Sequence, residues 1–119
     1  MNDKESLVYD LSIVKEASED IEYLKVITGY FINNSGEMLN ALDTAIKTSD
    51  LETAQNIAHK LSSNFYMFGL KEGAVALSKI ELNLLNKVNY NELPELILIA
   101  KNQGEKAIKQ LIRDFQNEF

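Results

Sequence analysis

The chain has no cysteine and one proline, and it has few basic residues. Without cysteine it can form neither disulfides nor thiolate metal sites. One proline and five glycines leave little material for the many turns of an all-β fold. Twelve basic residues against 18 acidic ones give a net charge of −6. Because contacts with phosphates need clustered cations, we expect no nucleic acid partner and no direct contact with an anionic membrane.

Long hydrophobic runs are also missing. No apolar stretch approaches the roughly 20 residues that a membrane helix needs. The beginning of the chain, Met1 to Ser6, is polar and acidic, unlike a secretory signal peptide. We therefore expect a cytoplasmic protein, or a cytoplasmic part of a larger one. A length of 119 residues suits one compact domain, so we expect residues 1–119 to form a single, monomeric domain.

Apolar residues recur at spacings of three and four along almost the whole chain, which predicts an all-α protein. Candidate caps and breaks divide this pattern. The expected helices are a short one after Asp10, then Ser18 to Ile32, a break at 33–36, Ser35 to Ile46, Asp50 to Phe68, Leu70 to Leu84, and Asn91 to Phe115. Because short connections make consecutive helices antiparallel neighbours, we expect an up-down antiparallel four-helix bundle with one or two short extra N-terminal helices.

The helix from Asp50 to Phe68 is the best delimited, and it carries the single histidine, His59. Asp50 is a good N-cap, and Gly69 suits a left-handed stop. At roughly 100° per residue, His59 lies roughly 140° from the centre of the apolar face, so we expect its side chain to be exposed. We expect no opposing charge beside it. A lone exposed histidine fits a surface residue without a special role, or a nucleophile whose chemistry a second protein completes.

The neighbours of His59 on the helical wheel suggest a docking surface. Ser63, one turn further on, is small and leaves the edge of the imidazole open. Tyr66 and Met67 lie toward the outer face, where an aromatic ring and a thioether can contact a partner. The alternative is that both pack under another helix of the bundle. The residues that we expect to contact a partner are Glu52, Gln55, Asn56, Tyr66 and Met67.

Other site chemistries are disfavoured, and we expect no cofactor and no metal. A di-metal bundle needs Glu-x-x-His on two helices, which one histidine cannot supply. Serine–histidine hydrolysis needs an oxyanion hole and an orienting acid, and Ser62 and Ser63 offer neither on the helix of His59. Glu81 falls near the inner stripe of its helix, and it is either buried and paired or turned outward.

The stretch Ile57-Ala58-His59-Lys60-Leu61, with Gly69 ten residues beyond the histidine, resembles the signature of histidine-containing phosphotransfer (HPt) domains. The resemblance covers roughly residues 7–86, and the last helix matches only in length and pattern. Its other parts are Tyr9 to Leu11, the junction at Phe31 to Ser35, the approach from Leu42 to Asp50, and Leu77 to Glu81.

The resemblance implies a relay in two-component signalling, with His59 as the phosphoacceptor. The partners would be receiver domains of response regulators, among them those of hybrid histidine kinases, and Mg²⁺ would be bound by the receiver. The chain would have no ATP-dependent kinase activity of its own. Many family members carry a phosphate-binding lysine and a glycine three and four residues after the histidine, where this chain has Ser62 and Ser63.

We expect Ser62 and Ser63 to lie next to the phosphate and to donate hydrogen bonds to it. We also expect Lys60 next to the phosphate: it is adjacent in sequence to His59 but points roughly 100° away around the helix, so it reaches the phosphate only by bending its long stem. The alternative function is a degenerate, non-phosphorylated helical module that still docks receiver or other signalling proteins.

Overall fold

In the computed structural model, residues 6–115 are described, and that part of the chain is helical without any strand. The elements are α1 (Ser12–Ala17), α2 (Ile21–Lys47), α3 (Leu51–Met67), α4 (Lys71–Asn86), the 3-10 turn η1 (Tyr90–Glu92) and α5 (Leu93–Phe115). The all-α prediction is confirmed.

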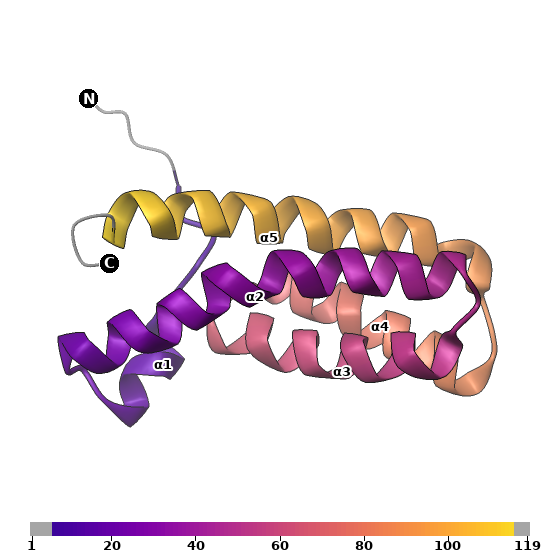
Figure 1. Cartoon of the computed structure of the whole chain (residues 1–119), viewed down its shortest axis with the longest axis horizontal. Helices are drawn as coiled ribbons and strands as arrows, with labels where there is room; N and C mark the ends of the chain where they lie inside the picture. The colour runs from indigo at the N-terminus through magenta and orange to yellow at the C-terminus, as the bar shows by residue number, and fades with distance from the viewer. Residues whose placement is uncertain (1–5, 116–119) are drawn as a thin grey trace.

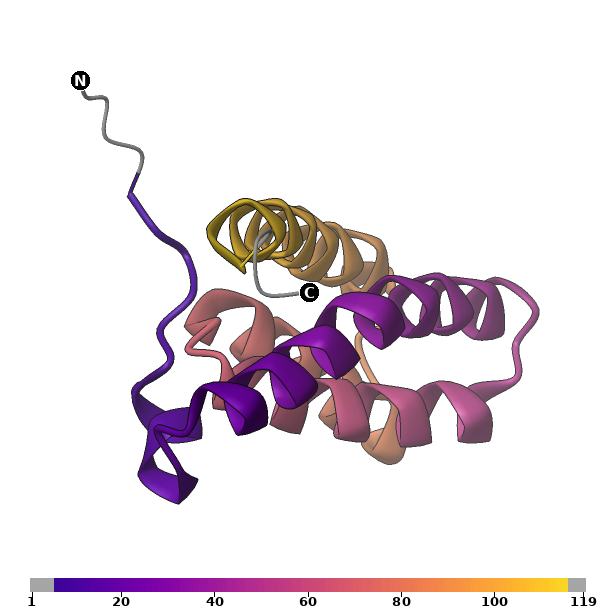
Figure 2. The same cartoon turned by 60° about the vertical axis from the view of Figure 1, so that its left-hand side comes forward.

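The four long helices lie side by side, and successive helices run in opposite directions along the bundle (Figure 1). Each packs against the next, and α5 also contacts α2, so the bundle closes. The N-terminal part of α2 continues beyond the end of α3, and α1 lies against it (Figure 2). The predicted helical bundle with a short N-terminal helix is therefore confirmed.

The predicted break at 33–36 is wrong, because α2 passes through these residues as one continuous helix of 27 residues. Ser35 does not cap a new helix. Its side chain is fully buried, on the same face as Phe31 and Leu39, which lie four residues before and after it. This spacing keeps the inward-facing stripe in register, and its packing outweighs the weak helix propensity of asparagine, serine and glycine.

The ends of the helices follow the expected signals in part. Asp50 accepts a hydrogen bond from the backbone N–H of Thr53 at 3.5 Å, so it caps α3 as predicted. Gly69 follows the end of α3 with φ +73°, the left-handed conformation that glycine tolerates. Asn91 does not cap the last helix: it lies within η1, and α5 begins two residues later at Leu93.

The ring of Phe65, on α3, contacts all three of the other long helices. A Cβ atom at Gly73 of α4 would lie 2.5 Å from its Cδ2, and one at Gly104 of α5 would lie 2.9 Å from its Cζ. The ring centroid of Phe31, on α2, is 6.0 Å away. Two glycines thus make room for one aromatic ring, which fixes the face of α3 that points inward.

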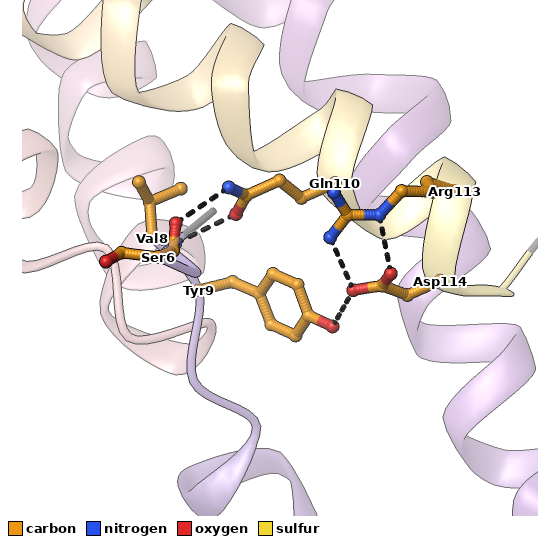
Figure 3. Close-up of polar contacts among 6 residues, drawn as sticks. All are labelled: Ser6, Val8, Tyr9, Gln110, Arg113 and Asp114. Atoms are coloured by element: carbon orange, nitrogen blue, oxygen red, sulfur yellow. Dashed lines mark hydrogen bonds and ion pairs between the residues drawn. The ribbon is translucent and has the colours of Figure 1, made fainter. Parts of the chain in front are cut away.

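Before α1, the chain crosses from the end of α5 to the turn between α3 and α4. We call this segment, Ser6 to Leu11, the N-terminal strap. The buried Gln110 holds it with both ends of its amide, as Figure 3 shows. Its Oε1 accepts from the backbone N–H of Val8 at 2.8 Å, and its Nε2 donates to the carbonyl of Ser6 at 3.0 Å.

Two further hydrogen bonds, from adjacent residues of the strap, fasten it to α5 and to the end of α3. The Tyr9 hydroxyl donates to Asp114 Oδ2 at 2.6 Å, and burial together with this carboxylate raises the pKa of Tyr9 (Figure 3). The backbone N–H of Asp10 donates to the carbonyl of Phe68 at 2.8 Å. A Cβ atom at Gly69 would lie 2.5 Å from Asp10 Cβ, so this glycine also permits the close approach of the strap.

The hydroxyls of Thr28 and Ser35 are buried on α2 without a hydrogen-bond partner among the described residues. Thr28→Val replaces the unpaired hydroxyl by a methyl group of similar size. We expect the free energy of unfolding in urea to rise by about 1 kcal/mol, because a desolvated, unpaired polar atom is removed. The matched control is Thr44→Val, an exposed position on the same helix, which should change it by less than about 0.5 kcal/mol. Unchanged or lower stability of Thr28→Val would contradict this account.

Asp43 joins α2 to α5, because its Oδ2 lies 3.0 Å from Lys101 Nζ and 3.2 Å from Lys47 Nζ. The hydrogen bond from Lys101, more than that from Lys47, holds the pKa of Asp43 below its usual value. A lowered pKa in the folded state contributes stability above the unfolded value of about 3.9, and this contribution is lost as the pH falls through the folded value.

Acid titration of stability tests the Asp43 contact. We expect the free energy of unfolding of the wild type to fall more steeply between about pH 5 and pH 2 than that of Asp43→Asn, which has no carboxylate to protonate. Urea unfolding at a series of pH values measures both slopes. Parallel slopes for the two proteins would show that the contact contributes nothing.

Candidate functional site

His59 lies on the exposed face of α3, and 67% of its side chain is accessible. The cap at Asp50 starts the helix, and the fully buried Leu61 and Phe65 direct the opposite face into the core. The exposure of the imidazole is therefore set by the packing on the far side of the helix, as the helical wheel predicts.

A carboxylate from the neighbouring helix contacts the imidazole. His59 Nδ1 lies 2.9 Å from Oε2 of Glu81, on α4, whose side chain is only 26% accessible. The expectation of no opposing charge beside His59 is wrong, because α4 packs directly on α3 and brings this carboxylate to its surface. Of the two alternatives for Glu81, the structure shows the paired one, half-buried.

This contact determines which nitrogen of His59 is free. A carboxylate accepts hydrogen bonds and does not donate them, so the neutral imidazole carries its proton on Nδ1 when it is paired with Glu81. The other nitrogen, Nε2, then carries the lone pair. Nε2 of the exposed imidazole is thus nucleophilic as it stands, because no catalytic base is needed to remove a proton from it.

A shallow hollow surrounds the His59–Glu81 pair, and Asn56 and Lys60 line it as well. Both side chains are exposed, and the Lys60 ammonium group adds a cation to its rim. Two other residues of the expected docking surface lie further toward the N-terminus of α3. Glu52 is exposed and Gln55 is half-buried.

Ser62 and Ser63 lie one turn beyond His59, with their hydroxyls directed at its backbone. Ser62 Oγ donates to the carbonyl of His59 at 2.8 Å, and Ser63 Oγ donates to the same carbonyl at 3.4 Å. Both hydroxyl protons are therefore occupied by the backbone. To donate to an anion bound at His59, each hydroxyl must first rotate away from this carbonyl.

Tyr66 and Met67 differ in their surroundings. Tyr66 is 59% exposed, as expected for a docking residue, whereas Met67 is half-buried and packs against the core. Both line a hollow between α3 and α4, which we call the α3–α4 hollow. Its lining consists of Ser62, Ser63, Tyr66, Met67, Ala74, Val75, Ser78, Lys79 and Leu82.

Sequence reasoning missed the α4 side of this surface. Val75 and Leu82 are exposed apolar residues, spaced by seven and therefore on one face of α4. They lie outside the inner stripe that contains Leu77 and Ile80. The sequence signal for them was the presence of apolar residues, at helical spacing, on a face of the helix that is expected to be polar.

Within residues 6–115, no group of three or more histidine, cysteine or acidic residues is arranged to hold a metal ion. In the same part of the chain, no helix is long and apolar enough to cross a membrane.

The family model of the Hpt domain matches residues 26–118. The match begins within α2 and includes α3, which carries His59, and α4, which carries Glu81. It also takes in α5, which the resemblance from sequence motifs had left largely aside. The comparisons with curated proteins and with solved structures gave no match. Because the matched region covers most of the chain, the protein belongs to the Hpt domain family, whose members take part in His-Asp phosphorelays and interact with receiver domains.

Proposed function

We propose that His59 accepts a phosphoryl group from the phosphoaspartate of one receiver domain and passes it to an aspartate of another. The observation that supports this most is the geometry of the imidazole: it is exposed, and Glu81 holds its Nδ1 at 2.9 Å. Such a nitrogen on a rigid helix, in a family of phosphorelay proteins, is suited to in-line attack.

The transfer needs few protein groups on this side. Nε2 of His59 attacks the phosphorus atom, an N–P bond forms, and the P–O bond to the aspartate breaks, with the aspartate leaving as a carboxylate. The proton stays on Nδ1, where the Glu81 carboxylate stabilises the positive charge that develops on the ring. The reverse sequence delivers the group to the second receiver. Mg²⁺, held by the receiver, would neutralise the charge of the phosphoryl oxygens.

Three side chains are proposed to lie next to the phosphoryl group. Lys60 shares a hollow with His59 and is the nearest candidate for a cation on the helix. Ser62 and Ser63 would turn their hydroxyls from the carbonyl of His59 to the phosphoryl oxygens. This set would replace the lysine and the glycine that many family members have at positions 62 and 63.

The docking surface is proposed to lie around His59 on α3. Tyr66 is its most exposed apolar residue, and the half-buried Met67 lies beside it. Glu52, Gln55 and Asn56 would contact the partner on the other side of the histidine. We further propose that residues 1–119 act as one monomeric domain in the cytoplasm, together with receivers that include those of hybrid kinases.

A second function is favoured by the residues after the histidine. With Ser62 and Ser63 in place of the lysine and the glycine, the domain could dock receivers without being phosphorylated. The contact between Glu81 and His59 favours the relay over docking alone, since docking does not require an imidazole in a fixed orientation. Direct phosphorylation separates the two functions.

The first experiment is phosphotransfer from receivers. Purified receiver domains of the source organism are phosphorylated with acetyl phosphate and mixed with this protein. We expect a phosphate bond that is labile to acid and stable to base in the wild type, as for phosphohistidine, and none in His59→Gln. Equal labelling of His59→Gln, or no labelling of the wild type by any receiver, would contradict the relay. Labelling is measured on gels after acid and base treatment.

The second experiment addresses the role of Glu81. Glu81→Gln keeps an oxygen that can accept from Nδ1, whereas Glu81→Leu removes the acceptor. We expect ¹⁵N NMR to show the neutral ring of His59 with its proton on Nδ1 in the wild type and in Glu81→Gln, and a mixture of both forms in Glu81→Leu. We further expect phosphorylation by phosphoramidate to slow by about ten-fold in Glu81→Leu. A ring with its proton on Nε2 in the wild type would contradict this role.

A further inference from the structure

We infer that a receiver domain docked at His59 also contacts α4. An apolar side chain of the receiver would lie in the α3–α4 hollow, and carboxylates of the receiver would face Lys79. This inference rests on the proposed function, and it adds three residues of α4 to the docking surface. These residues are Val75, Lys79 and Leu82.

Exposed apolar side chains gather around the hollow. Tyr66 on α3 is 59% exposed, and Val75 and Leu82 on α4 are 57% and 54% exposed. All three line the same depression. Single exposed apolar residues are ordinary, but three around one hollow form a contiguous patch, whose burial by a partner is favourable.

The hollow lies next to the reactive histidine. Ser62 and Ser63 form part of its α3 wall, and both donate hydrogen bonds to the carbonyl of His59. It therefore begins about one helical turn, or roughly 5.4 Å, from His59. A stable docked domain covers about 800 Å² of each partner. A receiver that brings an aspartate to Nε2 cannot cover such an area on α3 alone, and α4 packs against α3 and contacts His59 through Glu81.

The charge of the hollow suits an acidic partner surface. None of its nine lining residues is acidic, and Lys79 is its cation, in a chain with a net charge of −6. A receiver holds Mg²⁺ with carboxylates beside its phosphoaspartate, so the face that meets His59 is acidic. Lys79 and Val75 also line the adjoining hollow between α4 and α5, which places both on an exposed ridge.

The experiment compares two leucines of almost equal exposure. Leu82 on α4 is 54% exposed and lines the hollow, whereas Leu98 on α5 is 56% exposed and does not. Leu82→Glu and Leu98→Glu add the same charge to the surface. Each variant is phosphorylated in two ways, by a receiver charged with acetyl phosphate and by phosphoramidate, which needs no docking surface.

We expect Leu82→Glu to slow transfer from the receiver by about ten-fold and to leave the reaction with phosphoramidate unchanged. Leu98→Glu should change neither rate. Lys79→Glu should slow transfer from the receiver most at low salt, with the difference shrinking as the ionic strength rises. The phosphoramidate reaction also shows that each variant is folded around His59.

Three results would overturn the inference. The first is transfer from the receiver to Leu82→Glu at the wild-type rate, and the second is equal slowing in Leu98→Glu. The third is a concentration-dependent dimer of the wild type, seen by light scattering and abolished by Leu82→Glu, because the hollow would then bind a second copy of the chain. A wild type that accepts phosphate from no receiver is a different result, since it removes the proposed function itself.

Discussion

The packing of Phe65 between two glycines is the constraint on which the rest of the structure depends. Its ring fills the space that Cβ atoms at Gly73 and Gly104 would occupy, so α3 packs against α4 and α5 with this face inward. His59 precedes Phe65 by six residues, which places it about 120° away around the helix. With the ring fixed in the core, the imidazole points out of the bundle on the side of α4.

The same orientation brings the histidine to its polar partner, Glu81. Glu81 lies on a different helix, and it reaches Nδ1 of His59 because the Phe65 contact sets how α3 faces α4. The site then consists of an oriented nucleophile and a surface for a partner, and the remaining chemistry belongs to the receiver. The small number of polar groups around His59 follows from this division of labour.

The periodicity of the sequence predicted the helices and the exposed face of α3, because apolar spacing determines both. The periodicity did not predict the features that depend on contacts between helices. The residues Asn33 to Gly36 resemble a break, but the burial of Ser35 within the core stripe keeps α2 continuous. The partner of Glu81 was left open, and the apolar residues of α4 that line the hollow were not predicted. Both depend on the register of α4 against α3, which the pattern of a single helix does not give. The strap held by Gln110 was equally inaccessible, because its partners are about 100 residues apart.

The most direct test of the account asks which nitrogen of His59 becomes phosphorylated. The wild-type protein is treated with phosphoramidate, and ³¹P NMR distinguishes phosphate on Nε2 from phosphate on Nδ1. Because Glu81 occupies Nδ1, the account predicts a single phosphohistidine resonance, that of the Nε2 isomer, which is absent in His59→Gln. Phosphorylation at Nδ1, or no phosphohistidine at all, would contradict it.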